Sequence, residues 1–141
     1  MRCFLLLSIC LVSISCNEKL FTGDVNCSDC YTPKPDSAYL TIRFTINEDY
    51  KEVPFVLYRG DFEDNQIDWI DTSHTATKDV WVRTDQIYSV KAKYSKGDKI
   101  LYAVDGGKVK VLRVTDACEE ECYVIKDETL NLEISEIFLD F

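Results

Sequence analysis

Apolar and polar residues alternate along most of the chain from Ala38 onward. In the first run, Tyr39–Ile46, the even positions are leucine, isoleucine or phenylalanine, and the odd positions are mainly threonine and arginine. A period of two is typical of a strand with one buried face. Similar patterns predict further strands over Val53–Tyr58, Gln66–Asp71, Val80–Arg83, Ile87–Tyr94, Ile100–Val104, Lys108–Val114, Cys122–Ile125 and Leu130–Ile134.

The regular spacing of these short runs, with no helical period over any dozen residues, predicts an all-β fold. We expect an antiparallel sandwich of about 7–8 strands. Within it, Ile100–Val104 and Lys108–Val114 are expected to form a hairpin closed by Asp105-Gly106-Gly107, because glycine adopts the positive φ angles of tight turns.

The aromatic residues divide between the two faces of the predicted strands. Ile67 and Trp69 are expected to point inward, whereas Trp81 alternates with Val80 and Val82 and is expected to point outward. An outward tryptophan indicates a contact surface. Four aromatic residues are candidates for a sugar-stacking face, although packing between strands is the more common role of such side chains: Tyr58, Trp69, Trp81 and Tyr102.

The first 16 residues, MRCFLLLSICLVSISC, have the features of a secretory signal. Arg2 precedes an uncharged run of 11 residues from Phe4 to Ile14. A membrane span needs about 20 apolar residues, so this run has the length of a signal peptide rather than of an anchor. Small residues before Cys16 predict cleavage just ahead of it.

This segment resembles a bacterial lipoprotein signal of the Bacteroidota type, although Ser13 stands where leucine is usual. The resemblance implies that the Cys16 thiol is acylated, with palmitate among its chains, and anchors the protein in a lipid bilayer. It places the protein in the cell envelope, at the outer membrane, facing the periplasm or the surface. Plain secretion with a free Cys16 is the alternative. The chain then divides into a signal over 1–15, a lipidated N-terminus and tether over 16–37, and a sandwich domain over 38–141.

Charge narrows the classes of partner. The formal charge of the precursor is -9, and loss of Arg2 with the signal takes it to -10. Nucleic-acid binding is disfavoured, because phosphate contacts need clustered lysine and arginine. With one histidine in the chain, a histidine-rich metal site is disfavoured too, and no cofactor is expected.

Of seven cysteines, Cys3 and Cys10 leave with the signal and Cys16 takes the lipid. The remaining four, Cys27, Cys30, Cys118 and Cys122, predict disulfides in an oxidising compartment. Three pairings exist, and we favour cross-linking of the first pair to the second. The alternatives are a zinc site of four thiolates and a thiol–disulfide oxidoreductase that uses Cys27 and Cys30. Oxidation outside the inner membrane disfavours the zinc site, and acidic neighbours such as Asp29 disfavour the thiolate that an oxidoreductase would need.

Three polar motifs have weaker functional interpretations. Asp71, Ser73 and His74 resemble a hydrolase triad in composition, but neighbours in sequence rarely converge in that way. Residues 61–71 are rich in acidic side chains, which are typical of a solvated loop, and calcium binding is the alternative interpretation. Asp36-Ser37-Ala38 resembles the acceptor motif for O-linked glycans in Bacteroidota, with Ser37 as the modified residue.

The strands Tyr39–Ile46, Val53–Tyr58 and Tyr88–Tyr94 resemble the small transthyretin-like or carboxypeptidase-regulatory-like sandwiches of bacterial surface lipoproteins. An immunoglobulin-like topology is the close rival. We expect a membrane-anchored, non-enzymatic module for binding, adhesion or assembly, with an envelope protein or a glycan as partner. The alternatives are a periplasmic enzyme, using Cys27 and Cys30 or an unrecognised site, and a passive structural accessory subunit.

Overall fold

The computed structural model of the chain describes residues 25–135, and its regular structure there is β except for two short 3-10 turns. The turns are η1 (Cys27–Asp29) and η2 (Phe62–Asp64). The strands are β1 (Ser37–Arg43), β2 (Val53–Arg59), β3 (Ile67–Ser73), β4 (Thr77–Arg83), β5 (Ile87–Lys96), β6 (Lys99–Lys108), β7 (Lys110–Val114), β8 (Cys122–Lys126) and β9 (Thr129–Asn131). The all-β prediction is confirmed. Within this part of the chain, no helix has the length and apolar character needed to cross a membrane.

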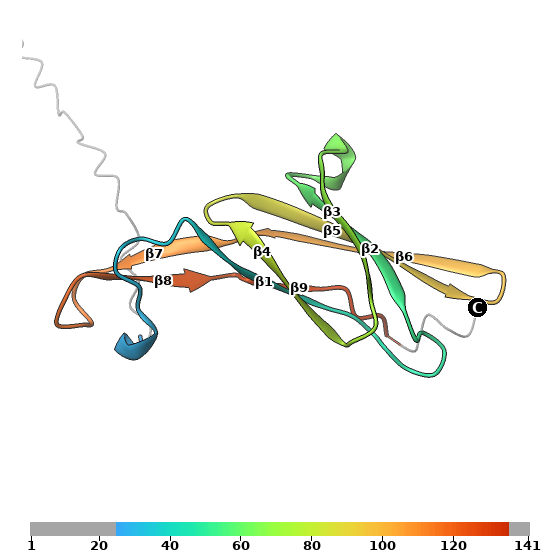
Figure 1. Cartoon of the computed structure of the whole chain (residues 1–141), viewed down its shortest axis with the longest axis horizontal. Helices are drawn as coiled ribbons and strands as arrows, with labels where there is room; N and C mark the ends of the chain where they lie inside the picture. Colours follow the sequence, from blue (N-terminus) through green and yellow to red (C-terminus); the bar gives the residue numbers. More distant parts are fainter. Residues whose placement is uncertain (1–24, 136–141) are drawn as a thin grey trace, which may run out of the picture.

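Two sheets face each other across the core, and a separate ribbon extends from one end (Figure 1). The larger sheet has the order β3-β2-β5-β6 and the smaller has the order β4-β1-β9, while β7 and β8 form the ribbon. Neighbouring strands are antiparallel except β1 and β9, which are parallel over three residue pairs. Here β1 and β4 lie in one sheet and β3, β2, β5 and β6 in the other. An immunoglobulin-like sandwich with a C′ strand also separates B and E from C′, C, F and G, so this order does not decide between the transthyretin-like and immunoglobulin-like alternatives.

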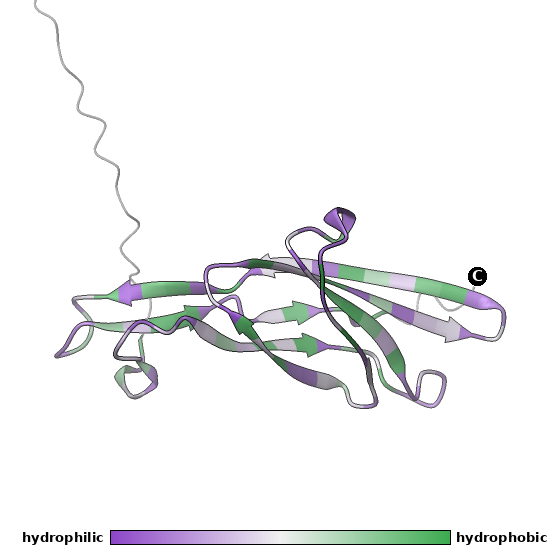
Figure 2. Ribbon diagram, turned by 45° about the horizontal axis from the view of Figure 1, so that its top comes forward, coloured by the Kyte–Doolittle hydropathy of each residue, from purple (hydrophilic) through white to green (hydrophobic). Residues whose placement is uncertain are grey.

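The alternating pattern predicted the core well. In Figure 2 apolar and polar colours alternate along the strands, and the inward positions of β1, β2 and β5 are almost fully buried. Two tyrosines of β5 reach across the core to the opposite sheet. The Tyr94 hydroxyl donates to the Leu132 carbonyl at 2.8 Å and accepts from the Thr45 amide at 3.1 Å, and the Tyr88 hydroxyl accepts from the Arg83 amide at 3.0 Å. Burial raises the pKa of Tyr94, so this hydroxyl stays protonated and can donate.

The hairpin expected at Asp105-Gly106-Gly107 is wrong. These residues lie inside β6, where Gly106 is paired with Ser89 of β5. The turn between β5 and β6 lies instead at Gly97, whose φ of +57° is the conformation that glycine adopts at little cost. Gly106 is needed for a different reason, because a Cβ there would lie 3.1 Å from the Tyr88 carbonyl oxygen and 3.2 Å from the Ser89 Cβ.

Gly106→Ala is expected to lower the free energy of unfolding by about 1–2 kcal/mol, since the added methyl group must displace the backbone of β5. Gly107→Ala is the matched control. Its Cβ would meet Leu130 at an ordinary 3.5 Å, and alanine costs less backbone entropy than glycine. Urea unfolding should therefore show Gly107→Ala neutral or slightly stabilised. Equal losses in the two variants would contradict the close-approach explanation.

The inward placement of Ile67 and Trp69 is also wrong. Both lie on β3, the edge strand of the larger sheet, and both side chains are about half exposed. An edge strand has a neighbour on one side only, so its side chains receive less cover than those of central strands. Alternation along β3 is therefore a poor guide to burial.

Candidate binding surface

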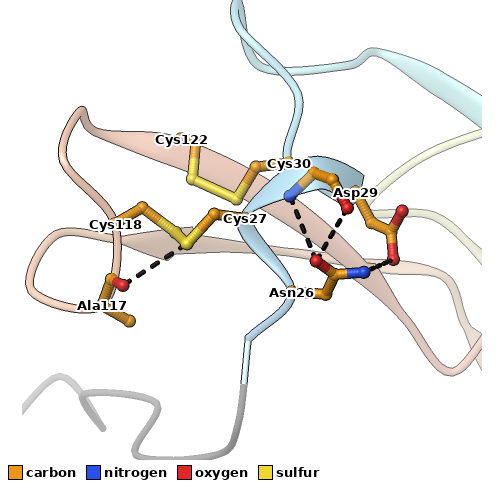
Figure 3. Close-up of a disulfide and its surroundings, with 8 residues drawn as sticks. Asn26, Cys27, Asp29, Cys30, Ala117, Cys118 and Cys122 are labelled. Atoms are coloured by element: carbon orange, nitrogen blue, oxygen red, sulfur yellow. Dashed lines mark hydrogen bonds between the residues drawn. A yellow bond between two sulfur atoms is a disulfide. The ribbon is translucent and has the colours of Figure 1, made fainter.

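Two disulfides hold the N-terminal segment against the ribbon of β7 and β8 (Figure 3). Cys27 is bonded to Cys118 and Cys30 to Cys122, with Cα–Cα distances of 5.8 and 5.5 Å. The expected cross-linking of the first cysteine pair to the second is thus confirmed. Local order brings the first pair into position, because the Asn26 side chain caps η1 by accepting from the Ser28 amide.

This end of the molecule has a small apolar cluster of its own. Val114, Cys122 and Val124 are buried there, with Val25 and Leu112 packed against them. Tyr31 extends the contact, since its backbone exchanges hydrogen bonds of 2.8 and 3.0 Å with Tyr123. The predicted tether therefore meets the ribbon at Cys27 and does not run free as far as Ser37.

The disulfide pairing bears directly on the two thiolate alternatives. A redox-active Cys27-Ser28-Asp29-Cys30 motif would alternate between two free thiols and a bond from Cys27 to Cys30, and the structure has neither arrangement. The sulfurs of Cys30, Cys118 and Cys122 do lie within 4.8 Å of one another. They are close because two disulfides are adjacent, and disulfide sulfur lacks the thiolate charge that binds zinc.

The polar motifs of the β2–β4 region do not converge on a reactive centre. The Ser73 hydroxyl is buried and donates to the Thr75 carbonyl at 2.7 Å, whereas His74 is exposed. Asp71 forms an ion pair with Lys78, whose hydrogen bond is the main reason that the pKa of Asp71 is lowered. The three groups of the supposed triad are thus not linked to one another.

The acidic loop does not gather its oxygens either. The Asp61 side chain caps η2, and Asp68 forms an ion pair with Arg59. In residues 25–135, no three acidic side chains of this loop come together closely enough to hold one ion. The calcium interpretation of residues 61–71 therefore finds no ligand set in the structure.

The four aromatic residues considered for sugar stacking are not brought together. Tyr58 is only 8% exposed, and Trp69 lies at the sheet edge. The ring of Tyr102, on the outer face of the larger sheet, is covered by Lys91, whose ammonium lies 4.6 Å from the ring centroid. Trp81 alone of the four has an exposed aromatic partner, and this partner is Tyr39.

Tyr39 and Trp81 form an exposed aromatic pair on the outer face of the smaller sheet. They face each other across β1 and β4, with ring centroids 4.8 Å apart and planes at 72°. Each side chain is 61% exposed, which confirms the outward direction predicted for Trp81. Sequence reasoning missed Tyr39 as a site residue, although the alternation Tyr39-Leu40-Thr41 already placed it opposite the core face.

The aromatic pair adjoins a polar hollow. Ser37 and Arg83 form the next cross-strand pair on the same face, and they also line an open hollow of about 570 Å³. Its other lining residues are Lys34, Pro35, Asp36, Thr84 and Gln86. Lys34 forms an ion pair with Asp85 at 2.7 Å, and this hydrogen bond is the main reason that the pKa of Asp85 is lowered. Ser37, the candidate for glycosylation, thus begins β1 at the edge of this hollow.

We name the Tyr39–Trp81 pair together with this hollow the aromatic platform. Aromatic rings beside unpartnered polar groups are typical of ligand contact surfaces. No protein-family model, curated protein or solved structure matches the chain. The aromatic platform is therefore our candidate binding surface on the evidence of its own residues.

Proposed function

We propose that the protein is an envelope lipoprotein, anchored through acylated Cys16, whose sandwich acts as a non-enzymatic binding module. The observation that carries the binding role is the aromatic platform. Two large rings, each 61% exposed, lie in contact with each other, and adjoining exposed aromatic side chains are enriched at contact surfaces. The proposed anchor would lie before Cys27, so the disulfides would connect the membrane attachment to the ribbon of β7 and β8.

Two alternatives remain as rival proposals. A periplasmic enzyme would need a reactive group, and neither the cysteines nor Ser73 and His74 are arranged as one. A passive accessory subunit would need no exposed aromatic pair, so the Tyr39–Trp81 pair favours a binding role over it. The transthyretin-like resemblance is retained as a proposal, with the immunoglobulin-like topology as its rival, since both are compatible with sheets that place β1 with β4 and β2 with β5.

Cys16→Ala is expected to abolish lipidation and to release the protein from the membrane fraction. A single acyl chain binds membranes only marginally, so the stable anchor would depend on a multiply acylated Cys16. The measurement is incorporation of an alkyne analogue of palmitate, followed by fractionation of the bacterial envelope. Cys10→Ala is the matched control, because this cysteine lies in the predicted signal and should leave labelling unchanged. Label that persists in Cys16→Ala would overturn the proposed anchor.

A further inference from the structure

We infer that the aromatic platform binds a neutral glycan, with one sugar ring packed against the Tyr39–Trp81 pair, stacked on one of the two rings and bordered by the other, and its hydroxyl groups held in the polar hollow. This inference rests on the proposed binding function and names its ligand class. The residues that carry it are Tyr39, Trp81, Ser37, Arg83 and Gln86.

The aromatic pair supplies the apolar part of such a site. A pyranose ring has an apolar face of C–H groups, and a flat aromatic ring covers that face while hydroxyl groups project from the sugar's edge. Elsewhere in residues 25–135 the aromatic pairs, Phe44 with Phe55 and Tyr50 with Tyr94, are buried. The Tyr39–Trp81 pair is thus the exposed aromatic pair of the described chain.

The polar hollow supplies hydrogen-bonding groups next to the rings. The Ser37 and Arg83 pair lies two residues from the Tyr39 and Trp81 pair along each strand, a step of about 7 Å. In the described part of the chain, the side chains of Ser37, Arg83 and Gln86 have no hydrogen-bond or ion-pair partner. Together they offer a guanidinium that donates to sugar hydroxyl groups, and a hydroxyl and an amide that both donate to and accept from them.

Charge in the hollow favours a neutral sugar over an acidic one. The hollow presents Lys34 and Arg83 against Asp36, and the Lys34 ammonium is already paired with Asp85. Positive and negative side chains are therefore balanced there. The chain as a whole has a formal charge of -9, so its long-range field would repel an anionic polysaccharide.

Other exposed rings of the described chain are less suited to stacking. Lys91 lies over Tyr102 and also 5.9 Å from the Phe62 centroid, so a sugar would have to displace this cation. Trp69 has no aromatic neighbour, and the open groove beside Phe62 is lined mainly by apolar side chains and glycine. Of its polar lining residues, Asp61, Ser89 and Asp105 already form hydrogen bonds within the protein, so fewer polar groups are left for a sugar there.

The test uses the two tryptophans of the chain as reporter and control. In the full chain with Cys16→Ala and Trp69→Phe, Trp81 is the remaining tryptophan. Its fluorescence is titrated with a panel of neutral oligosaccharides of hexoses and N-acetylhexosamines, and with oligogalacturonate as the anionic arm. We expect at least one neutral member to shift the emission in a saturable way at millimolar concentration or below.

Variants then locate the site by an isothermal binding measurement with the neutral sugar that binds. Trp81→Ala and Tyr39→Ala should each weaken binding at least tenfold, and Arg83→Ala several-fold. Trp69→Ala, which removes an equally large exposed ring elsewhere, should leave affinity unchanged. Circular dichroism verifies that each variant is folded, and the exposure of all four side chains makes loss of the fold unexpected.

Three outcomes would overturn the inference. These are no saturable shift with any neutral oligosaccharide, equal binding by Trp81→Ala and the parent, and tighter binding of oligogalacturonate than of every neutral sugar. Each is distinguishable from failure of the proposed anchor, because the palmitate label on Cys16 is measured independently. If the protein is labelled with palmitate but binds no sugar, the proposed anchor stands and the inference of a glycan ligand fails.

Discussion

Removal of both disulfides is expected to lower the free energy of unfolding by about 7 kcal/mol. Whichever disulfide is removed second should cost more than the one removed first. Each bond joins residues 91 or 92 positions apart, so either one alone closes a loop that contains most of the sandwich. Closing a loop of that length is worth about 4–5 kcal/mol in chain entropy. With one bond in place, the other closes only a short ring between neighbouring cysteines, worth about 2–3 kcal/mol.

The measurement is urea unfolding of three variants in the Cys16→Ala chain. Cys27→Ser with Cys118→Ser, and Cys30→Ser with Cys122→Ser, should each lose about 2–3 kcal/mol. The variant without all four cysteines should be close to its limit of stability, since a domain of this size has about 5–15 kcal/mol in total. Dithiothreitol should destabilise the parent and leave this last variant unchanged. A cost for one pair as large as the cost for both would contradict the shared-loop explanation.

Phe55→Ala is expected to lower the free energy of unfolding by about 3–5 kcal/mol. Phe55 is 1% exposed on β2 of the larger sheet. Its ring centroid lies 5.1 Å from that of Phe44, which follows β1 of the smaller sheet. Alanine would leave a cavity between the two sheets, and the rigid strands on either side can close it only in part.

Val56→Ala is the matched control for that substitution. Val56 is the next residue on β2 and lies on the outer face, opposite Ile70 and Lys91, where it is only partly buried. Its truncation should lower the free energy of unfolding by less than about 1 kcal/mol. The slope of that free energy against urea concentration should be the same as in the parent. Similar losses at the two positions would mean that the core does not lie between the sheets as described.

Strand positions and their buried faces were largely predictable from the sequence. The central strands β1, β2 and β5 begin within two residues of the predicted starts, and their inward residues are those that alternation indicated. The reason is local, because a strand that is covered on one face must place every second side chain in the core. That regularity also predicted the outward direction of Trp81 from its neighbours Val80 and Val82.

Errors occurred where the answer depended on a neighbouring strand. Asp105-Gly106-Gly107 has the composition of a turn, but Gly106 is required by its close approach to β5. Trp69 follows the alternation of its strand, but β3 lies at a sheet edge and leaves it half exposed. Sequence patterns report what one segment prefers, and neither a partner strand nor an edge is visible within a single segment.

The sequence by itself determined the all-β class, the core-facing residues of the central strands and the even set of four cysteines after the proposed signal. Tertiary structure alone decided which cysteines pair, since composition left three pairings open. It also decided that Tyr39 meets Trp81, and that both adjoin the hollow at Arg83. These contacts join residues about 40 to 90 positions apart, and only the packing of the sheets and the register of β1 against β4 bring such residues together.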